Sequence, residues 1–555
     1  MRKADLLAGT MALALLSAGF PLSAQPVIAL VQNNYSFILP GLPNYGIAPG
    51  ALMLIQGTGL TAPNSQAYPL QDPTQTLPKT LHGSSVTVTV NNTVSVQPAL
   101  YYTCAAAVCG TQYDLIAAVL PSSTPLGMLA QVTVKYNNVT SQPYNIALIQ
   151  SAFGFDTYYG AGNGMAGVTD NLANSPRPGH LITPSYPAKP GETITFWGAG
   201  IGADPNNTDD APPTNFDNLT DITQFFIGGQ PVSIAYQGRS HYQGVDQINV
   251  TLPASVPTGC AVSVTAVSGS GANAIVSNTV TIPISANGGP CSDALQPIST
   301  AQMSTLSSHP LVKFGVLGLS QATNTTGVVR TGTAQFTSIA GASLWPYLSN
   351  TLPSLGSCVV YQQSGPAPVN PFQLQGLSPG TIDVSANGTQ TALNTISNTP
   401  GVYTGSLTAG FLQPGTFTFT GQGGTDVQAF TTLPVNFPVA LNWTNKSDAT
   451  AVTRANGFTV VWTPGDSNTY VQISGSATEG ATAGLTEPTT VFFVCDADAG
   501  FGSFNIPAAV LMALPAAGGG MTVANYTYPA SFNATGLDFG YATSNVSVFV
   551  SGGFQ

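Results

Sequence analysis

Charged side chains are scarce in this chain of 555 residues, because Asp, Glu, Lys and Arg together make up only 6% of it. An average soluble domain has roughly 25%. The 11 Lys and Arg residues are outnumbered by 22 Asp and Glu residues, which gives a net charge of −11. Such a chain lacks the basic surface that attracts nucleic acid or an anionic membrane, so we expect neither as a partner.

Long apolar runs are also missing, except at the start of the chain. After residue 24 no unbroken apolar stretch reaches the roughly 18 residues that span a membrane, so we expect no transmembrane segment. Residues 1–24 combine a basic start at Arg2 and Lys3, a short apolar run from Leu6 to Phe20, and small residues before Gln25. This pattern is typical of a secretory signal peptide and predicts a secreted, extracellular or cell-surface protein.

Cysteine is rare, and the chain has six: Cys104, Cys109, Cys260, Cys291, Cys358 and Cys495. An even number in an exported chain favours disulfides. Six cysteines allow 15 pairings, among which sequence alone does not choose. We prefer the pairs of sequence neighbours, Cys104–Cys109, Cys260–Cys291 and Cys358–Cys495, with free buried thiols as the alternative. Zinc is less favoured because the cysteines do not form paired CxxC motifs.

Glycine and proline are abundant, with 60 and 43 residues. Both are poor in helix interiors and common in turns. The remainder is rich in Thr, Ser, Val and Asn, and Val and Thr, like Tyr and Phe, favour strands. The chain is longer than the about 250–300 residues that one hydrophobic core supports. The sequence therefore predicts an all-β protein of several domains.

The first half of the chain contains an internal repeat. Residues Pro49 to Leu60 align without gaps to Pro190 to Ile201, and Asp114 to Gly127 align to Asp246 to Gly259. Each copy offers about seven short strands with frequent turn signals, which is the pattern of a two-sheet sandwich. Between the aligned segments, each copy has a matched two-residue turn candidate, Asn91-Asn92 or Gly228-Gly229.

The motifs of the two copies resemble a known module. They include the Pro-Gly openings, Ile-Gly-Gly-Gln-Pro-Val from Ile227, Asp-Gln-Ile-Asn-Val-Thr-Leu-Pro-Ala from Asp246, and Ser-Asn-Thr-Val-Thr-Ile from Ser277. They resemble a secreted acidobacterial module of unknown function, which is similar to IPT/TIG-type immunoglobulin-like domains. The resemblance is closer over 180–283 than over 27–147. It implies two tandem immunoglobulin-like β-sandwiches and an exported location, and it implies no activity.

We therefore predict tandem immunoglobulin-like β-sandwich domains followed by one or two further β-domains. A pairing of Cys358 with Cys495 would join the last two of these units. One short helix is expected around residues 508–514. The predicted units are a signal peptide (1–24), module 1 (25–147), a connector (148–180), module 2 (181–283), a linker (284–300), a β-domain (301–435) and a C-terminal β-domain (436–555).

One motif matches the pattern around a catalytic serine. Gly376 to Gly380 reads Gly-Leu-Ser-Pro-Gly, but a nucleophile elbow needs a helix and a backbone NH after the serine. Pro379 has no NH, and Thr381 to Val384 predicts a strand, so we interpret the motif as a β-turn. The histidines form no HxxxH or HExxH pattern either; they are His82, His180, His241 and His309. We expect no catalytic residue and no enzyme, with a hydrolase of dispersed carboxylates as the least favoured alternative.

An acidic loop between Asp204 and Asp221 is the main candidate for a metal site. Calcium prefers clustered oxygen ligands on a flexible loop. Asp204, Asp209 and Asp210 are therefore weak calcium candidates, in a loop that also contains Asn206, Asn207 and Asp217. The spacing does not match an EF-hand, and a solvated loop is the favoured interpretation. Asp496 and Asp498 are a still weaker candidate, and no other cofactor is expected.

The chain has four tryptophans, Trp197, Trp345, Trp443 and Trp462. Three of the four lie in or next to apparent strands, so we expect them to pack in cores or interfaces. Our hypothesis is a non-catalytic exported protein that acts as an extracellular or cell-surface scaffold or adhesion-like protein. The alternative is a carbohydrate- or ligand-binding protein, assisted by calcium. The partners are unknown; other surface proteins and polysaccharide are the classes considered.

Overall fold

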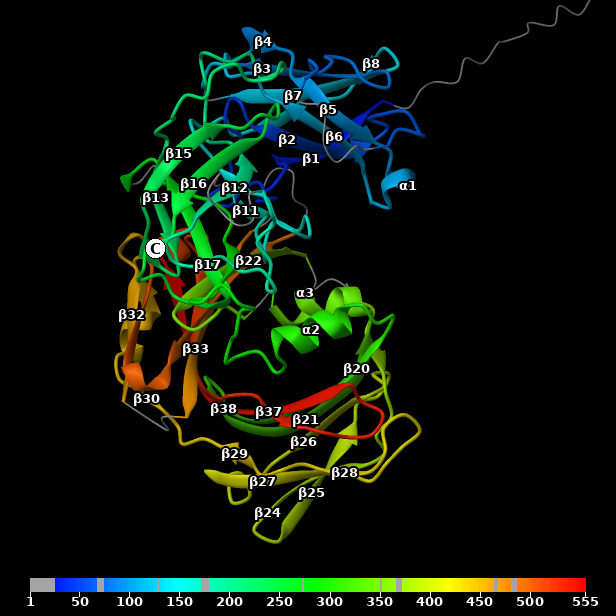
Figure 1. The fold of residues 1–555 in the computed structure, drawn as a ribbon, viewed down its shortest axis with the longest axis vertical. Coiled ribbons are helices and arrows are strands. Elements are labelled where there is room, and N and C mark those ends of the chain that lie inside the picture. Colours follow the sequence, from blue (N-terminus) through cyan, green and yellow to red (C-terminus); the bar gives the residue numbers. More distant parts are fainter. Residues whose placement is uncertain are drawn as a thin grey trace, which may run out of the picture.

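The computed structural model describes residues 25–66, 74–127, 129–170, 179–271, 274–349, 352–365, 372–463, 468–480 and 487–555. Strands in several sheets make up most of its regular structure (Figure 1), which confirms the all-β prediction. The expected signal peptide, residues 1–24, lies outside the described residues. Within the described ranges, no helix is long and apolar enough to cross a membrane.

Module 1 is a sandwich of two antiparallel sheets around one apolar core. Along one strand, Val86, Val88 and Val90 are buried and alternate with half-buried side chains, as the two-residue period of a strand requires. One sheet has the order β1 (Val27–Asn33), β2 (Leu52–Thr58), β6 (Asp114–Val119), β5 (Ala99–Cys104). The other has β4 (Val94–Val96), β3 (Ser84–Val90), β7 (Ala130–Tyr136), β8 (Val139–Thr140), with β9 (Tyr144–Ile146) also on β7.

Module 2 repeats this arrangement and adds one strand, β11 (Val168–Asp170). One sheet has the order β10 (Gly154–Phe155), β12 (Thr193–Ala199), β16 (Asp246–Thr251), β15 (Ile234–Arg239), with β11 added on β12. The other has β14 (Gln230–Pro231), β13 (Ile222–Ile227), β17 (Gly259–Ser268), β18 (Ile275–Val276), with β19 (Val280–Ile284) also on β17. The internal repeat of the sequence is thus a repeat of strand order.

Equivalent side chains have equivalent roles in the two copies. Asp114 accepts a hydrogen bond from the backbone NH of Leu60, at 3.0 Å, and Asp246 accepts one from Ile201, at 2.9 Å. Each aspartate begins a strand and holds the glycine-rich loop that follows the neighbouring strand. This shared contact explains why the aspartates and the glycine-rich segments recur together in the sequence.

The predicted hairpin turns differ between the copies. Gly228 and Gly229 form a two-residue loop in which both φ angles are positive, at 56° and 71°, as a type I′ turn requires. In module 1, Asn91 and Asn92 also have positive φ, but the strand register places Thr93 in the loop as well. The two-residue prediction is therefore confirmed in module 2 and wrong by one residue in module 1.

Residues 153–170, which lie in the predicted connector (148–180), are part of module 2. Both β10 and β11 pair with β12, and Phe153, Phe155 and Val168 are buried in the core of module 2. The prediction missed these strands because they are only two and three residues long, too short for a strand pattern. Module 2 therefore begins before residue 181.

Most strands in the second half of the chain belong to one continuous network of paired strands. Its main path has the order β22 (Ser357–Ser364), β34 (Thr489–Asp498), β33 (Thr469–Glu479), β36 (Gly518–Thr527), β38 (Phe539–Phe554), β20 (Val312–Asn324), β21 (Gly327–Ile339), β26 (Val402–Ser406), β25 (Thr389–Thr395), β24 (Ile382–Ala386), β27 (Gly415–Gly421), β28 (Phe430–Thr431). Attached to this path are β23 (Gln375–Gly376), β29 (Val435–Phe437), β31 (Ala451–Val452) and β37 (Ala530–Phe532). A separate sheet joins β30 (Asn442–Trp443), β32 (Phe458–Thr463) and β35 (Ser503–Ile506).

The predicted boundary between residues 435 and 436 does not separate two domains. Strand β20 pairs in parallel with β38, from Phe314 opposite Phe539 to Thr323 opposite Val548. One core also mixes residues from both sides of the boundary, such as Leu317 and Val546. Parallel pairing of strands so far apart in the chain leaves no local signal, which is why the sequence suggested a division here. We refer to residues 301–555 as the C-terminal unit.

Helices are few in the described residues. The helix expected around 508–514 is α4 (Ala508–Met512). The prediction missed α2 (Thr300–Ser307), although Ser299 and Gln302 form a capping box that marks its start. Short helical turns complete the fold: α1 (Ala106–Cys109), α3 (Leu344–Ser349), η2 (Gly341–Ser343), η3 (Lys446–Thr450), η4 (Arg454–Asn456) and η5 (Ala499–Phe501).

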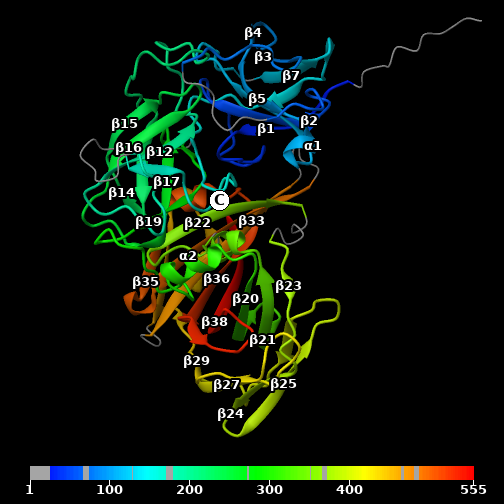
Figure 2. The same cartoon turned by 45° about the vertical axis from the view of Figure 1, so that its right-hand side comes forward.

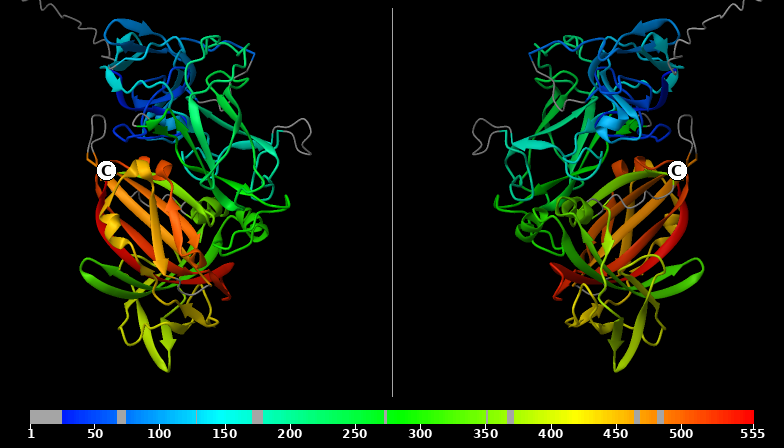
Figure 3. Two further views of the ribbon diagram at one scale, coloured as in Figure 1. Left: turned by 90° about the vertical axis from the view of Figure 1, so that its left-hand side faces the viewer. Right: turned by 90° about the vertical axis from the view of Figure 1, so that its right-hand side faces the viewer.

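The three parts of the molecule pack against one another (Figures 2 and 3). Leu52 and Val119 of module 1 share a small apolar cluster with Ala199 of module 2. On the far side of module 2, Val267 shares another cluster with Ala509 of the C-terminal unit. Because of these contacts, the outer faces of the sheets that meet are buried as well as the inner ones.

The six cysteines form three bridges: Cys104–Cys109, Cys260–Cys291 and Cys358–Cys495. This set is the one expected from sequence neighbours. The first bridge lies within module 1. The second ties the predicted linker 284–300 to module 2, and the third joins β22 to β34 inside the C-terminal unit.

Candidate functional site

The acidic loop of module 2 forms a buried ionic cluster with Arg239. This side chain, on β15, is 1% exposed, and its guanidinium lies 3.2 Å from Asp209 and 2.5 Å from Asp246. Burial lowers the pKa of Arg239, but the neighbouring Asp246 and Asp209 outweigh this effect and raise it above its ordinary value. The arginine is therefore held as a cation between two buried carboxylates.

The same cluster reaches across to module 1 through Ser122. Arg239 Nη2 donates to the Ser122 hydroxyl at 3.0 Å, and the Ser122 backbone NH donates to Asp209 at 2.5 Å. The backbone NH of Asp204, in module 2, donates to the same Ser122 hydroxyl at 2.8 Å. We call Arg239, Asp209, Asp246 and Ser122 the inter-module cluster.

A glycine of the repeat makes room for this cluster. Gly50 has a φ of 82°, a conformation that favours glycine, and a Cβ at this position would collide with the Arg239 guanidinium. The equivalent Gly191 in module 2 also has a positive φ, of 87°, but a Cβ there would meet no atom within 4 Å. The turn that the two copies share therefore needs a glycine for its backbone conformation in both modules. In module 1, the missing side chain of Gly50 also leaves room for Arg239 of module 2.

The weak calcium candidates are not brought together as a metal site. Asp209 pairs with Arg239, Asp210 pairs with Lys79 of module 1 at 3.0 Å, and the Asp204 carboxylate accepts from Asn206 and Asn207. In the described part of the chain, no three His, Cys, Asp or Glu side chains form a group that could hold a metal ion. The loop is therefore docked on module 1 around Asp209 and Asp210, whereas Asn206 and residues 214–216 are exposed to solvent, as expected.

Asp496, the weaker calcium candidate, is buried within the C-terminal unit. It is 0% exposed; one oxygen accepts from Gln472 at 3.2 Å and the other has no partner among the described residues. Burial raises the pKa of this carboxyl well above its ordinary value, with a further contribution from the nearby Asp293. Asp498 instead caps η5 by accepting from the backbone NH of Gly500.

This raised pKa predicts a pH-dependent stability. The folded state holds the Asp496 proton more tightly than the unfolded state, so the stabilisation is full below about pH 4 and is lost as pH rises toward the folded pKa. We expect Asp496→Asn to raise the melting temperature by several degrees at about pH 8 and to change it little at about pH 4. The exposed Asp448→Asn is the matched control. Equal shifts at both pH values would contradict the assignment.

The other sequence candidates lie apart from one another. Ser378 is followed by strand β24 rather than by a helix, as expected for a segment that is not a nucleophile elbow. His82 contacts the Thr103 hydroxyl at 2.8 Å, and the His241 ring packs against Phe216. Three tryptophans are buried as predicted, and Trp197 is half-buried with its indole NH donating to Thr169.

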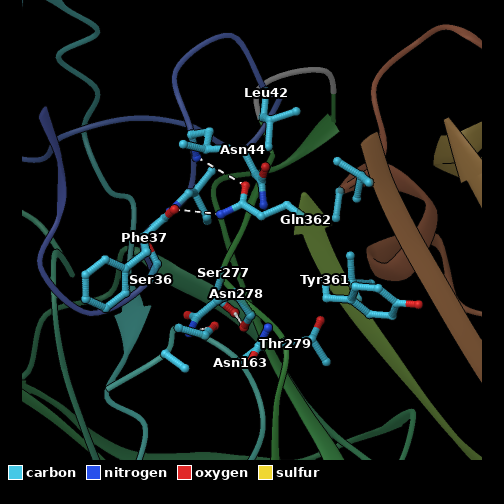
Figure 4. Close-up of a pocket in the computed structure, with 17 residues that line it drawn as sticks. Ser36, Phe37, Leu42, Asn44, Asn163, Ser277, Asn278, Thr279, Tyr361 and Gln362 are labelled. Atoms are coloured by element: carbon cyan, nitrogen blue, oxygen red, sulfur yellow. Dashed lines mark hydrogen bonds between the residues drawn. The ribbon is translucent and has the colours of Figure 1, made fainter. Parts of the chain in front are cut away.

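A pocket that the sequence did not indicate lies where the three parts of the molecule meet (Figure 4). We call it the junction pocket; its volume is about 220 Å³. Its walls come from the loop after β1 in module 1, from the loops before β11 and β19 in module 2, and from β22, β34 and the end of α4. Its labelled lining residues are Ser36, Phe37, Leu42, Asn44, Asn163, Ser277, Asn278, Thr279, Tyr361 and Gln362.

Gln362 fastens module 1 to the C-terminal unit at one side of the junction pocket. Its side-chain NH donates to the backbone oxygen of Phe37 at 2.6 Å, and its oxygen accepts from the backbone NH of Leu39 at 3.2 Å (Figure 4). Asn278 fastens the module 2 side by bonding both Phe155 backbone groups and the Gly162 oxygen. These amides shape the pocket, and no local sequence pattern brings them together.

Comparison with known proteins gives no functional relative. No family model matches the chain, and no curated protein matches it. Among solved structures, immunoglobulin domains 1–5 of Sidekick-1 match at 10% identity over 91% of this chain and 78% of theirs, with a TM-score of 0.14. The S-layer protein rSbsC matches at 10% identity over 94% of this chain and 54% of its own, with a TM-score of 0.17. An endo-fucoidan hydrolase of glycoside hydrolase family 107 matches at 11% identity over 68% of this chain and 44% of its own, with a TM-score of 0.10.

Proposed function

We propose that this protein is an exported, non-catalytic scaffold that acts as one rigid body at the cell surface or outside the cell. The observation that carries this proposal is the inter-module cluster. The ion pairs of Arg239 with Asp209 and Asp246 lie within module 2, and Ser122 of module 1 is hydrogen-bonded to this buried cluster. Swinging the modules apart would break the hydrogen bonds between Ser122 and Arg239, Asp209 and Asp204, and hydrogen bonds to charged groups contribute about 1.5–3 kcal/mol each.

The second junction supports the same function. All ten residues of β17 are buried, because its outer face lies against the C-terminal unit. The Ser357 hydroxyl accepts from the backbone NH of Ser263, and the Cys358 backbone NH donates to the Ser263 hydroxyl. A chain of flexibly linked domains would leave such backbone groups to water.

Solution scattering of the full chain tests the rigidity. We expect one conformation to account for the scattering curve, and the curve to stay the same from low salt to about 1 M salt, since buried pairs are screened much less than exposed ones. A curve that requires an ensemble of module orientations, or that changes with salt, would contradict a rigid scaffold.

The proposal includes export of the protein and the absence of catalytic activity. Support comes from the basic and apolar residues at the start of the chain, from the three disulfides, and from the resemblance of both modules to an exported acidobacterial module similar to IPT/TIG domains. Adhesion to other surface proteins or to polysaccharide fits such a scaffold. Cell fractionation, with detection by an antibody to module 2, tests export. Finding the chain in the cytoplasm with residues 1–24 still attached would contradict the proposal.

A further inference from the structure

The junction pocket has the chemistry of a binding site, and we propose that it binds a small, neutral, polyhydroxylated ligand, such as a monosaccharide or the end of a glycan. This proposal goes beyond the scaffold function and is independent of it. No Asp, Glu, Lys, Arg or His is among the residues that line the pocket. A charged ligand would lose its water there without gaining a counter-charge, so the lining favours a neutral one.

One polar atom of the lining lacks a protein partner. Asn44 is only 7% exposed, and its side-chain oxygen is buried. No described residue hydrogen-bonds to this oxygen. Buried polar atoms are nearly always hydrogen-bonded. This oxygen has almost no accessible surface, so a ligand hydroxyl can donate to it once the Asn44 side chain turns toward the pocket, and that turn is part of the proposal.

The opposite part of the lining offers further hydrogen-bonding groups (Figure 4). Asn163 and Thr279, from two loops of module 2, lie at the lower side of this view, away from Asn44 and Gln362. The other amides, of Asn278 and Gln362, are already used in holding the loops. Polar residues of module 1 and module 2 therefore line the pocket, and the hydrogen bonds of Asn278 and Gln362 hold neighbouring loops in place.

The remaining walls are apolar and aromatic, which suits the CH faces of a sugar ring. Tyr361 is among the lining residues, and its ring stacks on that of Phe492, with ring centroids 5.2 Å apart and an angle of 14°. Leu42 and Val491 complete the apolar surface. Specific small-molecule sites combine mostly apolar walls with a few placed polar groups, and the volume of about 220 Å³ lies below the roughly 300 Å³ at which sites for drug-sized ligands begin.

Binding is tested on the full chain by saturation-transfer NMR and thermal shift with glucose, galactose, mannose and N-acetylglucosamine. Short oligomers of the same sugars form a second arm, which separates a free monosaccharide from a glycan end. We expect at least one of these probes to bind and to raise the melting temperature with concentration, as a ligand of the folded state does. The charged analogue gluconate should not bind.

Two variants locate the site. We expect Asn44→Leu and Thr279→Val each to weaken binding about tenfold, the effect of losing one hydrogen bond to the ligand. The exposed Asn436→Leu is the matched control and should bind like the unaltered chain. If Asn44→Leu does not fold, binding by the nearly isosteric Thr279→Val variant shows whether the ligand occupies the junction pocket.

Three results would overturn the proposal. One is that no sugar binds at concentrations well above about 1 mM, the weak end of specific binding. Another is that sugars bind equally well to both pocket variants. The third is that binding is lost only in Tyr159→Ala, a change in an exposed aromatic pair with Tyr158, which would place the sugar there. None of these results would affect the scattering test of the scaffold.

Discussion

Replacing Arg239 by Met should lower the melting temperature of modules 1 and 2 more than any other single substitution considered for this protein. Removing one partner of a buried ion pair costs about 3–5 kcal/mol, because the remaining charges stay buried without compensation. Here two carboxylates, Asp209 and Asp246, would be left in this state. Calorimetry should show the transition about 6–20 °C lower, since each kcal/mol corresponds to about 2–4 °C in a region of this size.

If unpaired buried charge causes this loss of stability, two further results are expected. Arg330→Met removes a half-buried arginine whose side chain, among the described residues, bonds Gln321 and no carboxylate, so it should shift the transition by less than about 2 °C. Adding Asp209→Asn and Asp246→Asn to Arg239→Met should restore part of the loss, because the carboxylates are then neutral. If the triple variant were less stable than the single one, the loss would come from packing rather than from unpaired charge.

Removing the bridge between Cys358 and Cys495 should have an effect of similar size. The two cysteines are 137 residues apart in the chain, and constraining a loop of that length in the unfolded state contributes about 5 kcal/mol in the chain-entropy account. We expect the double Ala variant to melt well below the unaltered chain and to lose its sensitivity to reductant in the C-terminal transition. Thermal unfolding with and without reductant measures both effects.

The bridge between Cys104 and Cys109 provides the matched control for that result. Its sequence separation is only 5, so the same account gives about 2 kcal/mol. Its double Ala variant should therefore cause less than half the loss and should affect module 1. Equal losses from the two bridges would show that loop length does not set their contribution.

Much of the two modules follows from sequence pattern. The aligned segments from Pro49 and Pro190 became β2 and β12, and those from Asp114 and Asp246 became β6 and β16. These elements were predictable because each depends on local chemistry: alternating strand residues, a glycine at a positive φ, and an aspartate that holds the neighbouring loop. The capping box at Ser299 is an equally local signal, and it would have revealed α2.

The candidate sites did not follow from sequence in the same way. The acidic loop suggested calcium because its carboxylates are close together in the chain, yet their partners are Arg239 and Lys79, which are distant in sequence. The junction pocket combines Asn44, Thr279 and Tyr361, which belong to three different parts of the fold. Composition shows that such groups exist, but it does not show which of them meet.

Strand β17 shows where the contribution of sequence ends. Its residues alternate, with Val262, Val264 and Ala266 facing the core of module 2, and with Ser263 and Thr265 on the other face. By itself the sequence determined that this is a strand in a sandwich and which face is apolar, because both depend on a two-residue period. Only the tertiary structure decided that the polar face is buried too, since the C-terminal unit covers it and hydrogen-bonds to it; a small hydroxyl side chain is compatible with either water or a packed neighbour.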